Sequence, residues 1–155
     1  MNRLAAIALP ATLLLACSTT TLAQGRHCSA ALVSGKWAFT TTGTIVGIGP
    51  VSAVGTYTAD RSGHLTGSQT RSLKGDIADE TFTGTATVND DCTGVDVIEV
   101  YESGVLVRTT TLKIVYDANG RGARAIFIAL VLSNGLTLKP VLTIEAQKMF
   151  SGEGN

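Results

Sequence analysis

Turn signals recur at short intervals along most of this chain. They stand at Asp60 to Gly63, Asn89 to Asp91, Ser103-Gly104, Asn119-Gly120 and Asn134-Gly135. Asn-Gly is the strongest short-range signal for a β-hairpin, because both central residues of a type I′ turn need a positive φ. A chain punctuated in this way is predicted to fold as successive antiparallel strands.

The segment from Thr81 to Val88 alternates strictly between two kinds of side chain. Phe82, Gly84, Ala86 and Val88 alternate with four threonines. This alternation predicts a strand with one buried face and one face in solvent. Runs of strong helix formers with a spacing of about 3.6 residues are missing from Gly35 onward, which favours an all-β fold.

If each Asn-Gly pair is a two-residue loop, the register of the last strands follows. Leu112 then faces Phe127 and Ile114 faces Ala125, while across the second loop Phe127 faces Leu142 and Ala125 faces Ile144. One face is thereby predicted to form the core, and its members are Leu112, Ile114, Tyr116, Ala123, Ala125, Phe127, Ala129, Val131, Leu138, Leu142 and Ile144.

About eight strands joined by hairpins or short loops predict a single up-and-down antiparallel β-barrel, which leaves no exposed sheet edge. The sequence before Leu65 does not distinguish this fold from a β-sandwich, which stays as the alternative. The domain is expected to span residues 24–155.

Residues 1–23 have the features of a signal peptide: a basic start, a short apolar stretch and small residues before a cleavage site after Ala23. The apolar stretch is shorter than the roughly 20 residues of a membrane-spanning helix. Export to the periplasm or the extracellular space is therefore expected. The alternative is cleavage before Cys17, giving a lipoprotein anchored at that cysteine.

Either cleavage leaves Cys28 and Cys92 as the cysteines of the mature domain. In an oxidising compartment they are predicted to form a disulfide, and two buried thiols are the alternative.

Three segments, Cys28–Phe39, Phe82–Val88 and Asp91–Gly94, resemble a group of small exported proteins of soil bacteria without an established function. In addition, Gly35-Lys36-Trp37 resembles the Gly-x-Trp motif of lipocalins, a family of calycin barrels whose first strand opens with that tryptophan. A similar eight-stranded architecture occurs in allene oxide cyclase and dirigent proteins, which act on apolar small molecules. These resemblances imply a lipocalin-like barrel, but a fold does not fix a function.

Several kinds of chemistry lack the residues that they need. The chain has no Gly-x-Ser-x-Gly motif and only two histidines, His27 and His64, so neither a hydrolase nor a zinc site is proposed. The 12 basic and 12 acidic residues form no basic run, so nucleic acid is not an expected partner. The acidic residues around Asp76 to Glu80 lack calcium-loop spacing and are interpreted as solvated loop carboxylates. No metal and no cofactor are expected.

One group of residues is a candidate ligand site. With Ser103-Gly104 as a two-residue loop, Glu99 faces Arg108 on the inner face, although a three-residue loop would change this pairing. We expect Tyr101, Phe82 and Phe127 on the same face, beside small residues that leave space for a ligand. The simpler interpretation is that Glu99 and Arg108 only neutralise each other.

Three functions follow from these predictions. The leading hypothesis is an exported protein that binds a small apolar molecule in its barrel, with Arg108 or Tyr101 at the polar end of the ligand. An alternative is a cyclase or isomerase that uses Glu99 as acid or base, although a protein without enzymatic activity is favoured. A structural or adhesion module without a cavity is the third.

The same registers predict an apolar patch on the outer face, and its members are Ile98, Val100, Val107, Ile126, Ile128, Leu130 and Leu132. A contiguous patch of this kind indicates a homo-oligomer interface. Cover by residues 24–34 or a β-sandwich core would explain it equally well.

Overall fold

The structure, a computed structural model, describes residues 27–149. Within this range one short helix precedes the strands: α1 (Ala30–Val33), β1 (Gly35–Ile45), β2 (Gly49–Ala59), β3 (His64–Leu73), β4 (Asp76–Val88), β5 (Thr93–Glu102), β6 (Val105–Tyr116), β7 (Gly122–Leu132), β8 (Thr137–Leu138) and β9 (Pro140–Lys148). Each strand from β1 to β7 pairs antiparallel with the next, and β9 pairs with both β7 and β1.

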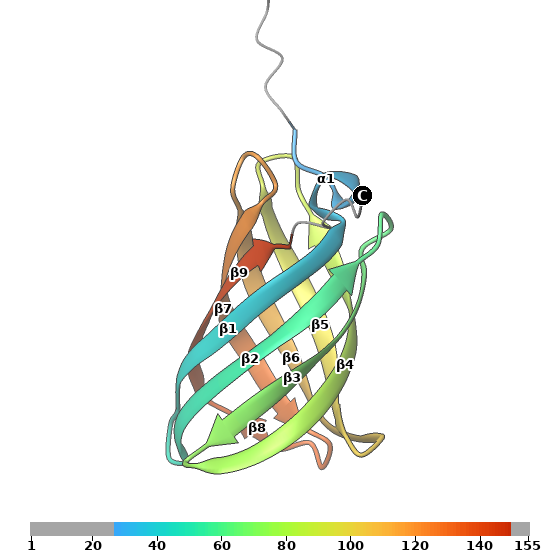
Figure 1. Cartoon of the computed structure of the whole chain (residues 1–155). Coiled ribbons are helices and arrows are strands. Elements are labelled where there is room, and N and C mark those ends of the chain that lie inside the picture. The colour runs from blue at the N-terminus through green and yellow to red at the C-terminus, as the bar shows by residue number, and fades with distance from the viewer. Residues whose placement is uncertain (1–26, 150–155) are drawn as a thin grey trace, which may run out of the picture.

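The sheet is therefore closed on itself (Figure 1). The two-residue β8 and the longer β9 both lie against β7, so together they fill one position and the barrel has eight. The predicted up-and-down β-barrel is confirmed, and the β-sandwich alternative is rejected.

The alternation in β4 separates inside from outside as predicted. Phe82 is buried, with 6% of its surface exposed, while the four threonines between Thr81 and Thr87 all lie in solvent. On the neighbouring β3, Gly67 allows the ring of Phe82 to lie flat against the wall, since a Cβ there would lie 2.5 Å from Phe82 Cζ.

The hairpin at Asn119-Gly120 has the predicted register in the part nearest its loop. Leu112 pairs with Phe127 and Ile114 with Ala125. The loop itself is longer than predicted: Asp117 and Gly122 close it with a backbone hydrogen bond of 2.8 Å, which leaves four residues between them.

The predicted register fails beyond Phe127. Thr111 pairs with Ala129 and Leu112 with Phe127, so Ile128 is an extra residue that forms a β-bulge. A bulge reverses which side chains face inward. Leu130 is consequently buried, with 2% exposed, and Ala129 and Val131 face outward instead of forming core.

The last hairpin has a three-residue loop at positions 133–135, because Leu132 N–H bonds to Leu136 C=O. Ala125 pairs with Ile144 as predicted. Phe127 and Leu142 form no ladder pair, because β7 then continues against β8.

The Ser103-Gly104 loop does contain two residues, flanked by the pair Glu102 and Val105. Both residues have positive φ, 49° and 80°, as a type I′ turn requires. A second bulge follows at Val107, where Tyr101 pairs with Leu106 but Val100 already pairs with Arg108. The predicted pair of Glu99 and Arg108 is therefore wrong, and Glu99 pairs with Thr109.

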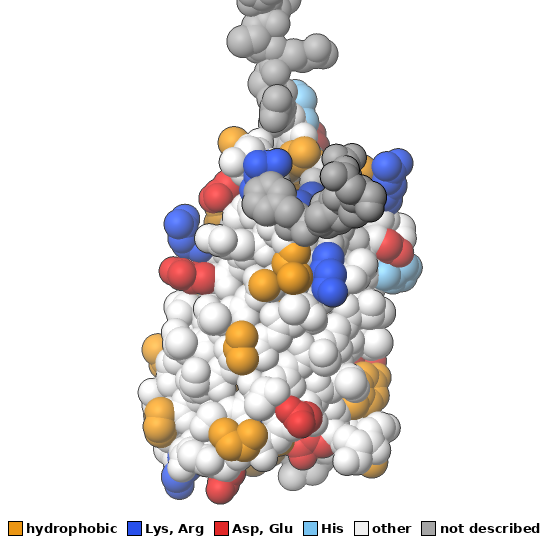
Figure 2. Space-filling view, viewed as in Figure 1, with side chains coloured by type: hydrophobic (Ala, Val, Ile, Leu, Met, Phe, Trp, Pro, Cys, Tyr) orange, Lys and Arg blue, Asp and Glu red, His pale blue; other side chains and the backbone are white. Residues whose placement is uncertain are grey.

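The predicted outer patch is also wrong, because the two bulges change which side chains of the strands face outward. Val100 and Leu130 are buried, and Ile98, Val107 and Leu132 pack against the two core clusters. Only Ile126 and Ile128 of that set are well exposed, at 50% each. The rest of the outer surface includes many hydroxyl side chains, and Figure 2 shows few charges over the middle of β1 to β3.

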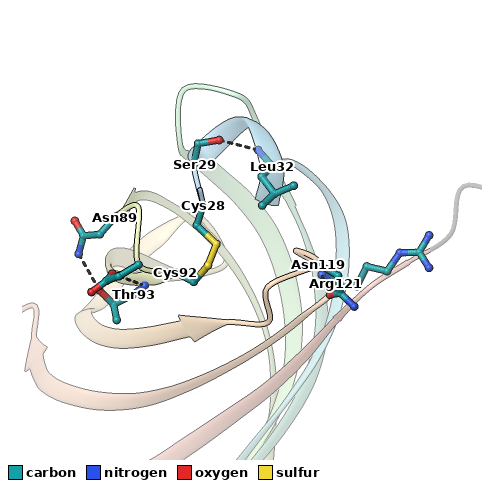
Figure 3. Close-up of a disulfide and its surroundings, with 9 residues drawn as sticks. Cys28, Ser29, Leu32, Asn89, Cys92, Thr93, Asn119 and Arg121 are labelled. Atoms are coloured by element: carbon teal, nitrogen blue, oxygen red, sulfur yellow. Dashed lines mark hydrogen bonds between the residues drawn. A yellow bond between two sulfur atoms is a disulfide. The ribbon is translucent and has the colours of Figure 1, made fainter. Parts of the chain in front are cut away.

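One end of the barrel is closed by α1 (Figure 1). The predicted disulfide joins Cys28, just before α1, to Cys92 in the loop between β4 and β5 (Figure 3). Trp37 is fully buried beneath the helix, and its Nε1–H donates to the Val33 carbonyl at 2.9 Å. Lys148 of β9 also binds the helix: its Nζ donates a hydrogen bond to the Leu32 carbonyl at 3.0 Å.

The expected signal peptide, its cleavage site and Cys17 lie outside the described residues. The disulfide is consistent with export. Within residues 27–149 the structure contains no helix of the length and apolar character needed to cross a membrane.

Candidate binding site

A buried carboxylate lies on the inner side of the barrel wall. Glu80 on β4 has no exposed side-chain surface, and Arg108 on β6 grips it with two hydrogen bonds, Nη1 to Oε1 at 2.7 Å and Nη2 to Oε2 at 2.5 Å. Two side chains of β3 complete its environment. Arg71 Nε donates to Oε1 and Gln69 Nε2 donates to Oε2, each at 2.7 Å. Both oxygens are therefore satisfied, as a buried charge requires.

Arg71 extends this network toward solvent. Its Nη2 donates to Glu102 Oε1 at 2.9 Å, and the Glu102 side chain is 39% exposed. We call Gln69, Arg71, Glu80, Glu102 and Arg108 the polar layer. It contains two cationic and two anionic side chains, so its net charge is zero.

The electrostatics of the polar layer keep Glu80 ionised. Burial by itself would raise the pKa of this carboxyl, but the hydrogen bonds and charge of Arg108, with hydrogen bonds from Arg71 and Gln69, outweigh burial and lower the pKa to about 2. Glu80 is thus a fixed anion at physiological pH, held by two guanidinium groups.

A cavity of about 260 Å³ lies on one side of the polar layer, at the end of the barrel opposite α1. We call it the mouth cavity. Its polar lining is Thr41, Gln69, Arg71, Glu102 and Arg108, and its apolar lining is Ile45, Ile48, Val51, Ala53, Leu73, Val107, Phe127, Leu130, Leu132, Leu138 and Leu142. An apolar wall with a few convergent polar groups is typical of small-molecule sites.

Two smaller cavities lie farther into the barrel. A cavity of about 50 Å³ shares part of its wall with the mouth cavity, namely Thr41, Gln69, Arg108 and Phe127. A third, the inner cavity, of about 40 Å³, shares Phe39, Phe82, Ile98, Leu112 and Ile144 with the second. The three cavities therefore follow one another along the lumen.

Aromatic rings and one acid surround the inner cavity. Phe39 packs edge-on against Phe82 with ring centroids 5.9 Å apart, and Tyr57 stacks on Trp37 at 6.0 Å. Asp96 of β5 also lines this cavity; it is 5% exposed, and its Oδ1 is buried without a hydrogen-bond partner. Burial raises the pKa of Asp96 to about 7.

The structure separates the five predicted ligand-binding residues. Arg108 and Phe127 line the mouth cavity, and Phe82 lies deeper, beside the inner cavity. Glu99 and Tyr101 lie on the outer face, where Tyr101 Oη donates to Glu99 Oε2 at 2.8 Å. The bulge at Val107 causes this difference, because it shifts the partner of Glu99 from Arg108 to Thr109.

Two important residues, Glu80 and Arg71, were not predicted, and Glu80 was assigned to a solvated acidic loop. β4 in fact begins at Asp76. Extending the alternation of Phe82, Gly84 and Ala86 backwards by one step would have placed Glu80 inside. Likewise, Arg71 continues the inward positions of Leu65, Gly67 and Gln69 on β3.

Residues 27–149 bring together no group of three or more His, Cys, Asp or Glu side chains that could hold a metal ion.

Comparison with protein-family models and with curated protein sequences finds no match to this chain. Among solved structures, the chain is similar to a redesigned β-barrel, mFAP1, bound to DFHBI. The TM-score is 0.51 with 20% sequence identity, and the match covers 77% of this chain and 98% of that one. Another redesigned β-barrel matches with a TM-score of 0.50 and 18% identity, over 79% of this chain and 96% of that one. At these identities the likeness shows a shared barrel fold.

Proposed function

We propose that this protein binds a small, mainly apolar molecule in the mouth cavity, with any polar end of the ligand against the polar layer. The observation that carries the proposal is the mouth cavity itself, about 260 Å³ in volume and lined mainly by aliphatic side chains. An apolar cavity of about 150 Å³ is large enough to bind benzene, and ligand pockets commonly measure about 300–1,000 Å³. The ligand is accordingly small.

The polar layer sets what the polar end of such a ligand meets. Arg108 and Arg71 form ion pairs with Glu80, and Arg71 also forms one with Glu102. The charges of the polar layer are therefore already neutralised within the layer. A neutral polar group, such as a hydroxyl or carbonyl, accepts or donates a hydrogen bond there without breaking an ion pair. An acid is disfavoured relative to a neutral ligand, because it would have to compete with Glu80 for Arg108.

The relation to mFAP1 supports this proposal at the level of architecture. That protein is a redesigned β-barrel of similar fold whose structure is bound to DFHBI. Two observations favour binding over the alternatives predicted from sequence. Glu99, the expected acid or base of an enzyme, lies on the outer face, and the lumen contains a cavity. The proposal includes export and a lipocalin-like carrier role. The disulfide is consistent with export.

Octanol and DFHBI are suitable probes, measured by calorimetry and by dye fluorescence. Ala53 lies on the wall of the mouth cavity, so Ala53→Phe fills part of that space. Ala38→Phe makes the same change on the outer face of the neighbouring β1, opposite Thr56. We expect the wild type and Ala38→Phe to bind at least one probe, and Ala53→Phe to bind it at least tenfold more weakly (roughly 1.4 kcal/mol or more).

If the folded wild type bound neither octanol nor DFHBI, the proposed function would be overturned. Equal affinity of Ala53→Phe and the wild type would place the site elsewhere and overturn it too. Near-ultraviolet circular dichroism of each variant checks that the barrel has kept its packing.

A further inference from the structure

Asp96 is a buried acid, and one of its two carboxyl oxygens has no hydrogen-bond partner. Its residue surface is 5% exposed, and Oδ1 makes no hydrogen bond, unlike Glu80, which accepts four. A buried polar atom without a partner destabilises a fold, and most native proteins avoid it. Such an atom indicates either an ordered water or a ligand group that binds there.

The surroundings of Asp96 are suited to a cation. Three aromatic rings, those of Phe39, Tyr57 and Phe82, line the same inner cavity. The faces of aromatic rings attract ammonium groups, and a carboxylate accepts a charge-assisted hydrogen bond from them. The inner cavity, about 40 Å³, is slightly larger than the roughly 30 Å³ that one water molecule occupies in the liquid. It therefore fits one ammonium group and not a bulky head.

No cation of the protein fills this role among the described contacts. Arg108 and Arg71 are both committed to Glu80, in the polar layer. The other titratable groups that interact with Asp96 are the phenols of Tyr57 and Tyr116, and burial first, then neighbouring charge, raises the pKa of both above the usual range. Both phenols stay neutral, so neither neutralises a charge on Asp96.

The three cavities share wall residues from the mouth inward to Asp96. The cavity of about 50 Å³ borders the mouth cavity at Thr41 and Phe127, and borders the inner cavity at Ile144 and other residues. Phe127 and Ile144 come from β7 and β9, and Thr41 from β1, whereas Arg71, Glu80 and Arg108 come from β3, β4 and β6. A slender alkyl chain that reaches Asp96 would therefore lie along this side of the lumen, past the polar layer.

We propose that the ligand is an apolar primary amine, whose chain occupies the lumen from the mouth cavity inward and whose ammonium group binds Asp96 in the inner cavity. This inference rests on the proposed function and adds the chemical class of the ligand. The mouth cavity supplies apolar contact area, and Asp96 with the three rings supplies selectivity for the cation.

The test compares octylamine with octanol, which has the same chain and a neutral end, by calorimetry at neutral pH. Asp96→Asn removes the charge and keeps the shape of the side chain. Asp79→Asn is the matched control, because Asp79 is an exposed acid on the outer face of β4, where it accepts a hydrogen bond from Thr70. We expect octylamine to bind the wild type and Asp79→Asn roughly tenfold to a hundredfold more tightly than octanol does.

In Asp96→Asn this preference should disappear while the affinity for octanol stays the same. An amine preference that persists in Asp96→Asn, or no preference in the wild type, would overturn the inference; a water bound to Asp96 would then explain the inner cavity. Binding of octanol or DFHBI with no amine preference leaves the proposed function standing, whereas failure of all three probes to bind the wild type overturns both.

Discussion

Glu80 and Arg108 meet side by side inside the barrel, joined by two hydrogen bonds of 2.7 and 2.5 Å between carboxylate and guanidinium. They come from β4 and β6, with β5 between them, so their contact crosses the lumen side of the sheet. This paired geometry fixes the planes of both groups. Arg108 also lies in the wall that the mouth cavity shares with the second cavity.

Replacing one member of this pair should lower the free energy of unfolding more than replacing both. Arg108→Met leaves Glu80 with Arg71 as its only cationic partner, and breaking a buried pair lowers the free energy of unfolding by about 3–5 kcal/mol. In the double variant Glu80→Met with Arg108→Met, Arg71 keeps Glu102, so we expect a smaller loss. Urea unfolding measures both, with exposed Arg124→Met as a control within about 0.5 kcal/mol of wild type. A double variant less stable than Arg108→Met would contradict this account.

The stability of the protein should fall as the pH rises toward neutrality. Burial raises the pKa of Asp96 to about 7, above the ordinary value of 3.8 that it regains on unfolding. The folded state therefore holds a proton that the unfolded state has lost, and the stabilisation present at low pH disappears as Asp96 ionises. The loss is expected between the two pKa values, from about pH 4 to about pH 7, and is on the order of a few kcal/mol.

Asp96→Asn isolates this contribution, because it is neutral at every pH. The difference in unfolding free energy between wild type and Asp96→Asn, followed by urea unfolding, should decline with rising pH. A difference that stays constant would show that Asp96 titrates normally in the folded protein.

The disulfide should contribute most of its stabilisation by restricting the unfolded chain. Cys28 and Cys92 are 64 residues apart, and closing a loop of that length is worth about 4 kcal/mol. Cys28→Ala with Cys92→Ala, and the wild type after reduction, should both lose roughly this amount in urea unfolding. A much smaller loss in both would show that α1 and Trp37 hold the closed end without the covalent link.

The sequence predicted the architecture well because hairpin signals and alternation are local properties. The loop at Ser103-Gly104 and the pairs around Ile114 and Ala125 could be derived from turn chemistry alone. The two bulges could not. Val107 and Ile128 are ordinary strand residues by composition, and nothing local marks them as the extra residues that curve the sheet.

The errors in the candidate site follow from those bulges. Each one exchanged the inner and outer faces of the strand beyond it, so Glu99 and Tyr101 were predicted inside and Leu130 outside. Asp96 was missed for the same reason, because it lies on the same face of β5 as Ile98 and Val100, which the predicted register placed outside. It lies between Val95 and Val97, which are partly exposed, so the usual rule of apolar inside and polar outside is inverted on that part of β5.

The most direct test of the account is to map where octanol binds. Methyl-selective NMR of the protein, titrated with octanol, reports on Ile45, Leu130 and Leu142 of the mouth cavity and on Ile126 and Ile128 of the outer face. Binding in the lumen predicts saturable shifts of the first three methyl signals and little change in the other two. Shifts confined to the two outer isoleucines, or no saturable shift at any of the five, would contradict it.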